Sequence, residues 1–268
     1  MSGVDADVRT EYLGADSLLY AVDHRPWMPP DGPWIMAQTW HDLAFLHYAI
    51  EPGVLRALVP SQLTLDTYSG NAWLSVIPFW MSNVRPPGVP AVPGFSKFGE
   101  LNVRTYVSYG DKPGVYFFSL DAQNLSAVWG ARVFYRLPYW HAQMKIGLPT
   151  KQEPGPVRYQ SKRLHGPKAA NGMPEFRGAY GPTGEASAPK RGSLNAFLVE
   201  RYCLYAWNRQ KLYRAEIHHL PWALQPAAAA VEANTMAEPL GFALPLEADI
   251  THYARMAKVL VWPPERLK

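Results

Sequence analysis

The stretch ELNVRTYV at residues 100–107 alternates polar and apolar side chains. In a strand, residues two apart point to the same face. One face would carry Glu100, Asn102, Arg104 and Tyr106, and the other Leu101, Val103, Thr105 and Val107. A carboxylate and a guanidinium on one face could together move a proton and hold an anion.

The alternation also permits a second interpretation, in which the polar face meets solvent. The next segment, GVYFFSLDA at 114–122, is apolar or aromatic at most positions, as in a strand buried on both faces. The polar face of its partner would then line an interior cavity, where charged groups need a partner or a ligand. We therefore predict that Glu100 and Arg104 face a cavity, and that the apolar face packs beneath helices.

A second group of reactive side chains follows a Leu-Pro turn in VFYRLPYWHAQM, residues 133–144. Tyr139 offers a phenol and His141 an imidazole, and Trp140 stands between them. Either Tyr139 or His141 could be the proton-transfer partner of Glu100. Alternatively, Tyr139 and Trp140 fill a pocket with aromatic bulk, and His141 is a structural histidine.

The histidine and cysteine residues do not predict a metal site. His218 and His219 are adjacent, so in a strand they point to opposite faces. His41 and His47 share a face but would lie about 20 Å apart. Cys203 is the single cysteine, which excludes an internal disulfide and a cysteine-based zinc site. GxGxxG, Walker, GxSxG and HExxH motifs are also absent, so we expect neither a metal nor a cofactor.

The elements that must position these residues are mostly strands. Strands are predicted at 35–50, 63–81, 100–109, 114–122, 156–164, 202–208, 211–220 and 251–262. A hairpin turn is predicted at Ser69-Gly70 within the segment 63–81, and Arg209-Gln210 is predicted to join strands 202–208 and 211–220. Helices are predicted at 50–60 ended by Pro60, 127–136 ended before Pro138, 194–202 capped by Ser193, and 226–237. Loops are predicted at 82–98 and 166–193.

This order of elements predicts a mainly β fold with flanking α-helices. Many short strands that do not alternate with helices favour an antiparallel sheet curled into a barrel, with a few helices packed outside. Residues 34–268 would form this single domain. Residues 1–33 would form an N-terminal tail and a proline-rich segment leading into the barrel.

Composition and charge are those of an ordinary globular protein, with 48% hydrophobic residues, 18% charged residues and a net charge of +4. Residues 145–168 are basic, but no aromatic residues are interleaved for stacking on bases, so a solvated face is favoured over a nucleic-acid site. The sequence shows neither a signal peptide nor an apolar stretch of membrane-spanning length. We expect a cytoplasmic protein with no membrane or nucleic-acid partner; its oligomeric state is open, and a homo-oligomer is possible.

Several segments carry a family resemblance, among them 40–81, FGELNVRTYV, GARVFYRLPYWHA, IHHLPW and THYAR. They resemble the bacterial YqjF-like proteins of unknown function, from about Trp34 to the end of the chain. That family is similar to the acetoacetate decarboxylase-like superfamily. The resemblance implies a cone-shaped, largely antiparallel barrel around a small-molecule cavity, in agreement with the fold predicted from the pattern.

The same resemblance implies roles for particular residues. In the decarboxylases a carboxylate occupies the position of Glu100, and two lysines follow the proline of the turn. The first lysine forms a Schiff base with the substrate. Here those positions are Tyr139 and Trp140, and neither side chain can form an imine. His41 falls near an arginine that holds the substrate carboxylate in the decarboxylases.

From these residues we predict acid-base chemistry, without an imine, on a small carboxylate or carbonyl compound. The catalytic candidates are Glu100, Tyr139 and His141, and the substrate-binding candidates are Arg104, His41 and Trp140. The alternative is a non-catalytic binder or sensor of a small apolar or acidic metabolite, because an aromatic-rich barrel is a ready ligand cavity. A scaffold protein with exposed proline-rich loops is a third class.

Overall fold

The computed structural model describes residues 14–268, apart from 93–95, 126–127, 130–131 and 133–134. The strands of this part join in one 13-stranded sheet. They are β1 (Met36–Ile50), β2 (Thr64–Leu65), β3 (Ala72–Arg85), β4 (Phe98–Tyr109), β5 (Lys112–Ala122), β6 (Tyr139–Gly147), β7 (Val157–Arg163), β8 (Glu175–Pro182), β9 (Cys203–Asn208), β10 (Lys211–His218), β11 (Gln225–Asn234), β12 (Ile250–Val261) and β13 (Glu265–Arg266). The helices are α2 (Ala15–Tyr20), α3 (Pro52–Arg56), α5 (Leu194–Val199) and the 3-10 helix η1 (Glu238–Leu240).

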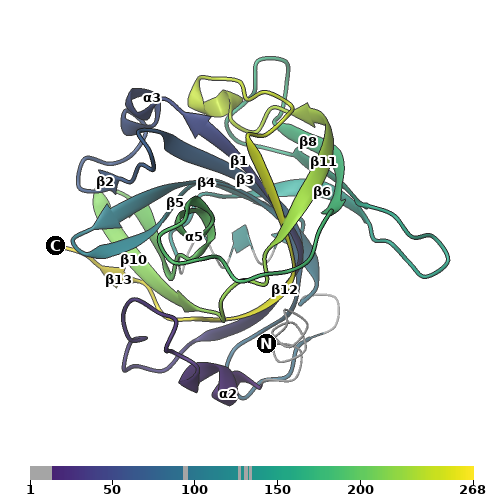
Figure 1. The fold of residues 1–268 in the computed structure, drawn as a ribbon. Coiled ribbons are helices and arrows are strands. Elements are labelled where there is room, and N and C mark those ends of the chain that lie inside the picture. The colour runs from purple at the N-terminus through teal and green to yellow at the C-terminus, as the bar shows by residue number, and fades with distance from the viewer. Residues whose placement is uncertain (1–13, 93–95, 126–127, 130–131, 133–134) are drawn as a thin grey trace.

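The sheet closes on itself in two rings. The larger ring runs through β5, β6, β7, β8, β11, β12, β1, β3 and β4. In the smaller ring, β9 and β10 connect β5 to β12, and β1, β3 and β4 complete the circle. The pairs are antiparallel except that β5 runs parallel to β6 and β9. Figure 1 looks along the smaller ring, with α5 across its opening and β6, β8 and β11 to one side. The predicted barrel of mainly β type is confirmed.

The wall shared by the two rings is covered on both faces. Phe45 and Phe79 point into the smaller ring and belong to its core. Val76 and Val103 point the other way and pack in a second core with Tyr159 of β7. The apolar face of β4 therefore packs against a second layer of strands, not beneath helices as the sequence predicted. Burial on both faces explains why β4 is buried over most of its length.

The turns predicted from the sequence are present, but one predicted strand pairing is not. Arg209 and Gln210 have φ values of 47° and 60° and join β9 to β10 in a tight hairpin. Positive φ at both positions matches the twist of paired strands. The turn at Ser69-Gly70 is also present. However, β2 before this turn pairs with β4 rather than with β3.

Two predictions for the second half of the chain are wrong. The alanine-rich segment 226–237, predicted as a helix, is largely strand β11, whose residues alternate in exposure. It pairs with β8, which lies within the predicted loop 166–193. A Cβ atom on Gly178 of β8 would lie 2.8 Å from the Ala230 carbonyl, so small residues let these strands approach closely. Pairing with β8 thus outweighs the helix propensity of alanine.

The helices close one end of the smaller ring and brace its outside. Ser193 accepts a hydrogen bond from the Ala196 N–H and caps α5, as predicted. Leu198 and Val199 of α5 are buried in the core of the smaller ring. The predicted short helix near 50–60 corresponds to α3. The helix predicted at 127–136 falls partly on residues outside the described ones.

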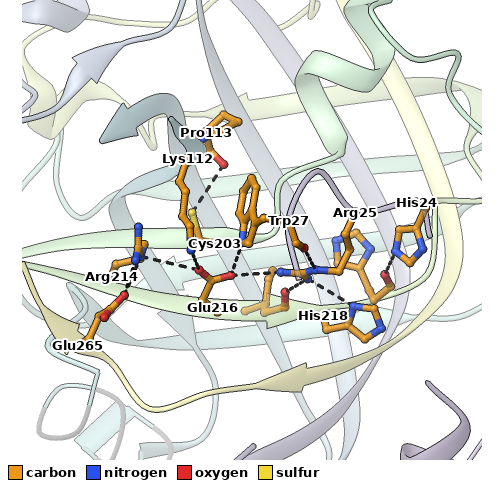
Figure 2. Close-up of polar contacts among 12 residues, drawn as sticks. His24, Arg25, Trp27, Lys112, Pro113, Cys203, Arg214, Glu216, His218 and Glu265 are labelled. Atoms are coloured by element: carbon orange, nitrogen blue, oxygen red, sulfur yellow. Dashed lines mark hydrogen bonds and ion pairs between the residues drawn. The ribbon is translucent and has the colours of Figure 1, made fainter. Parts of the chain in front are cut away.

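Residues 18–27, here called the N-terminal strap, pack on the outside of the barrel. Leu18 is only 2% exposed. Arg25 and Trp27 both donate hydrogen bonds to Oε2 of Glu216 on β10, at 3.1 and 2.7 Å. Lys112 donates to the other carboxylate oxygen at 3.0 Å. Figure 2 shows Glu216 between these donors. The segment before Trp34 is therefore fastened to the barrel through a buried carboxylate.

The basic segment 145–168 lies on β6, β7 and the connections that follow them. Its exposed basic side chains are Lys145, Lys151, Arg158, Lys162 and Lys168. Arg163 differs because it is buried and donates to both carboxylate oxygens of Asp121 on β5. This ion pair joins the second layer of strands to the wall of the smaller ring.

Among the described residues, we find no helix with both the length and the apolar character needed to cross a lipid bilayer.

Candidate functional site

The smaller ring encloses a cavity of about 540 Å³. Its walls are mainly apolar side chains of β1, β3, β4 and β5, such as Phe45, Ile77 and Phe117. The polar side chains that line it are Gln38, Glu100, Asn102, Arg104, Tyr135, Tyr139 and Arg201. An apolar cavity with a few polar groups has the composition of a small-molecule site.

The register of the strands places the polar residues of β4 at successive levels of the cavity. Glu100 lies opposite Phe79 of β3 and Ala122 of β5. Asn102 lies opposite Ile77 one level further, and Arg104 lies opposite Ser75 at the next. The alternation recognised in the sequence therefore produces a polar row along one wall of the cavity.

Glu100 is the single acidic side chain among the described lining residues. It is 3% exposed, and the Tyr139 hydroxyl donates a hydrogen bond of 3.0 Å to its Oε2. Burial raises the pKa of Glu100 to about 8, although hydrogen bonds from Tyr139 and Asn102 partly oppose this effect. A carboxyl group with such a pKa can exchange a proton near neutral pH.

Tyr135 also lines the cavity, and the sequence analysis did not single it out. Its hydroxyl is buried and has no hydrogen-bond partner among the described residues. Tyr135 raises the pKa of Tyr139 after the larger effects of burial and of Glu100, which indicates that the two phenols are neighbours. The signal in the sequence was the YRLPY turn, which brings two tyrosines four residues apart to one site. Because residues 127–136 were predicted to form a helix, Tyr135 was not considered as part of the turn.

Arg104 is a buried cation without a carboxylate partner in the described part of the chain. Its Nη2 donates a hydrogen bond of 3.4 Å to the Leu198 carbonyl of α5, and its Nε has no acceptor. Burial lowers the pKa of Arg104. Arg201 also lines the cavity but is neutralised by Asp66, with an Nη1 to Oδ2 distance of 2.5 Å. Arg104 is thus the lining cation that remains available for an anion.

Three of the six predicted site residues meet at the cavity, namely Glu100, Arg104 and Tyr139. His41, Trp140 and His141 are not among the lining residues. The His41 ring stacks on Trp80 at a centroid distance of 3.9 Å and shares a hydrogen bond with the Ser82 hydroxyl. Burial lowers the pKa of His41 to about 4.

Trp140 and His141 occupy the junction between β5, β6 and β7. The Trp140 ring lies 5.5 Å from the guanidinium carbon of Arg163 and packs closely against Gly166. The His141 carbonyl accepts a hydrogen bond from the Leu164 N–H. Both residues therefore hold the start of β6 in place, and of residues 139–141 Tyr139 alone lines the cavity.

The donor groups of the described residues do not assemble into a metal site. In that part of the chain, no group of three or more His, Cys, Asp or Glu side chains is arranged to hold an ion. The polar groups that the cavity itself presents are carboxyl, phenol, amide and guanidinium groups.

Comparison of the sequence with known proteins identifies its family. A model of the family DUF2071, described as an uncharacterised conserved protein, matches residues 37–258. The uncharacterised protein YqjF of Bacillus subtilis is 47% identical over 234 residues, which cover 87% of this chain and 93% of that protein.

Solved structures with similar folds include the enduracididine biosynthesis enzyme MppR complexed with pyruvate, with a TM-score of 0.61, 12% identity, and coverage of 92% of this chain and 93% of that one. An acetoacetate decarboxylase-like enzyme from Sphingomonas wittichii has a TM-score of 0.57 and 14% identity, and the match covers 97% of this chain and 99% of that one. Acetoacetate decarboxylase from Legionella pneumophila has a TM-score of 0.55 and 13% identity, with coverage of 96% of each chain. These similarities establish the acetoacetate decarboxylase-like fold.

Proposed function

The chain belongs to the DUF2071 family of uncharacterised conserved proteins, and we propose that its cavity catalyses proton transfer at a carbon atom next to a carbonyl group. The observation that carries this proposal is Glu100, an acidic side chain in an apolar cavity with its pKa raised to about 8. A carboxylate with a raised pKa is a stronger base than an ordinary glutamate.

In this reaction the ionised Glu100 removes the proton from the α-carbon, and the electrons of the C–H bond move to the carbonyl oxygen. The hydroxyl of Tyr135, which has no partner in the described part of the chain, donates a hydrogen bond to the oxyanion that forms. Glu100 then returns its proton to carbon, at the same or a conjugated position. Tyr139 fixes the Glu100 carboxylate through its 3.0 Å hydrogen bond. One carboxyl group is sufficient for both proton transfers.

The proposal excludes the imine chemistry of the decarboxylases. By the family resemblance, Tyr139 and Trp140 stand at the positions of their lysine pair, and no lysine occurs among the described residues that line the cavity. Borohydride reduction of the protein mixed with acetoacetate or pyruvate should therefore give no covalent adduct by mass spectrometry. A stoichiometric adduct would show that another lysine reaches the cavity and would overturn this part of the proposal.

The reaction can be tested without knowledge of the natural product. The protein is mixed with a panel of ketones, aldehydes and keto acids, including pyruvate, in deuterated buffer, and the loss of α-proton signals is followed by NMR. We expect accelerated exchange for at least one compound, and Glu100→Gln should abolish it. Arg158→Met, a change on the exposed face of β7, is the matched control and should exchange at the wild-type rate.

A non-catalytic binder is the second candidate, and the mainly apolar cavity wall favours it. The same panel separates the two functions. Saturable binding of carbonyl compounds by calorimetry, with no exchange above the rate in buffer between pH 6 and 10, would establish a binder and contradict the enzyme.

A further inference from the structure

A polar layer crosses the barrel at the level of Arg104. His47 of β1 lies directly opposite Ser75 of β3, which lies directly opposite Arg104 of β4. His252 of β12 lies opposite Phe45, next to His47 along the barrel. All four polar residues are buried. Of these, Arg104 alone is among the residues that line the main cavity, and the other three lie beside it in the same wall.

Three nitrogen atoms of this layer have no hydrogen-bond partner among the described residues. They are Nε2 of His47, Nδ1 of His252 and Nε of Arg104. The other nitrogen of His47 is occupied, because Ser75 Oγ lies 2.7 Å from its Nδ1. The rings of His47 and His252 are 5.4 Å apart. Since buried polar groups in proteins are almost always satisfied, this concentration of free nitrogens indicates a ligand position.

The charges around the layer favour an anion. Arg104 is a pure hydrogen-bond donor with a permanent positive charge, and no described residue forms an ion pair with it. Arg201, the neighbouring guanidinium, is already paired with Asp66. Each free imidazole nitrogen can carry a proton and donate it in a hydrogen bond. A metal cation would be repelled by the unpaired Arg104 guanidinium.

The anion position and the proton-transfer position lie at different levels of the cavity. Glu100 and Arg104 are four residues apart on one strand, which separates their Cα atoms by about 14 Å. The Arg104 guanidinium donates to the Leu198 carbonyl of α5 and lies 5.8 Å from the Tyr106 ring and 5.9 Å from the Phe45 ring. Between these two positions the wall is apolar at Phe45 and Ile77, and Asn102 of β4 adds one amide, whose Oδ1 has no hydrogen-bond partner among the described residues.

We propose that the ligand is a carbonyl compound with a carboxylate at the far end of an apolar chain. The carboxylate binds Arg104 together with His47 and His252, and the carbonyl group lies at Glu100 and Tyr135. The carbonyl end of this inference rests on the proposed function, whereas the carboxylate end rests on the polar layer alone. Short keto acids such as pyruvate, in which the two groups are adjacent, cannot reach both positions.

Binding of straight-chain saturated carboxylates to the wild-type protein tests the carboxylate end. Acetate, hexanoate and decanoate are titrated by calorimetry, with the primary alcohols of equal length as controls. We expect one site per chain, affinity that increases about fourfold for each methylene group buried, and at least tenfold weaker binding of each alcohol. Alcohols that bind as tightly as the acids, or affinity that does not depend on chain length, would overturn the inference.

Variants locate the site. Arg104→Met should weaken decanoate binding at least tenfold, and His252→Phe should weaken it less, whereas the matched control Arg158→Met on the exposed face of β7 should leave it unchanged. Arg104→Gln, which keeps a polar side chain but removes the charge, replaces Arg104→Met if that variant does not fold. Unchanged binding by the Arg104 variants would contradict the assignment.

Failure of this inference can be told apart from failure of the proposed function. Glu100→Gln should still bind decanoate, because the carboxylate end does not use Glu100. Decanoate binding without α-proton exchange on any carbonyl compound would refute the proposed function alone. Exchange on short ketones without decanoate binding would refute the long-chain carboxylate alone.

Discussion

The Tyr139 hydroxyl donates a 3.0 Å hydrogen bond to Oε2 of Glu100, and this contact joins the start of β6 to the middle of the cavity wall. It brings together a residue recognised by strand alternation and one that follows the Pro138 turn. Because Tyr139 is a donor here, it can orient the carboxylate in the direction of a bound substrate. The hydrogen bond also stabilises the ionised form that removes a proton.

Glu100→Gln should stabilise the folded protein, and this effect should depend on pH. The folded pKa of Glu100, about 8, exceeds its ordinary value of 4.5, so between these values the folded state binds more protons than the unfolded one. The free energy of unfolding therefore falls as pH rises from 4.5 to 8, by up to several kcal/mol at about 1.4 kcal/mol per pKa unit.

Thermal unfolding of the wild type and of Glu100→Gln from pH 4 to pH 9 measures this difference in stability. The advantage of Glu100→Gln should be small near pH 4 and largest near pH 8. An advantage that is constant with pH would show that Glu100 titrates normally in the folded protein.

Tyr135→Phe should lower α-proton exchange by about 100-fold, as expected for loss of one oxyanion donor. It should change the free energy of unfolding by no more than about 1 kcal/mol, because among the described residues the Tyr135 hydroxyl has no hydrogen-bond partner to lose. Tyr159→Phe is the contrasting variant, since that hydroxyl donates to the Phe79 and Glu100 carbonyls. It should cost about 1–2 kcal/mol in denaturant unfolding. Equal exchange rates in Tyr135→Phe and wild type would remove Tyr135 from the reaction.

Arg163→Met should destabilise the protein by about 3–5 kcal/mol, because it leaves Asp121 as an unpaired buried carboxylate. Arg177→Met is the matched control, since its ion pair with Glu232 is largely exposed and contributes about 1 kcal/mol or less. Urea unfolding of the two variants gives the comparison. Similar losses in both would show that the Asp121–Arg163 pair does not hold the two layers of strands together.

Glu216→Gln should loosen the N-terminal strap without changing the chemistry of the cavity. It leaves the buried cation Arg25 without a charged partner, which should cost about 3 kcal/mol. Hydrogen exchange followed by mass spectrometry should show faster exchange of the amides in residues 18–27. The rate of α-proton exchange per folded molecule should stay at the wild-type value. Slower chemistry with an unchanged strap would contradict the structural role given to Glu216.

The sequence predicted the strands best where alternation or flanking turns were clear, as in β4, β5, β9 and β10. It failed at β11, where alanine has no strand preference and only pairing with β8 decides the conformation. The sequence also did not indicate that β6 begins directly after Pro138, because parallel pairing with β5 and antiparallel pairing with β7 determine that strand.

For the site, alternation placed Glu100 and Arg104 on one face, and the family resemblance pointed to Tyr139. The layer of His47, Ser75 and His252 could not be predicted, because it depends on the register of three strands. In the sequence, His47 was informative only through its spacing from His41. Register is set by packing of the whole barrel, which local patterns do not encode.

The pH dependence of α-proton exchange tests the central claim most directly. Exchange of a responsive carbonyl compound is measured by NMR from pH 6 to pH 10 for the wild type and for Glu100→Gln. Because the ionised form of Glu100 is the base, the wild-type rate should rise with pH and level off above a pKa of about 8, while Glu100→Gln stays at the rate in buffer. A wild-type rate that is constant over this range, or a Glu100→Gln variant that keeps the wild-type rate, would contradict the assignment of Glu100 as the base.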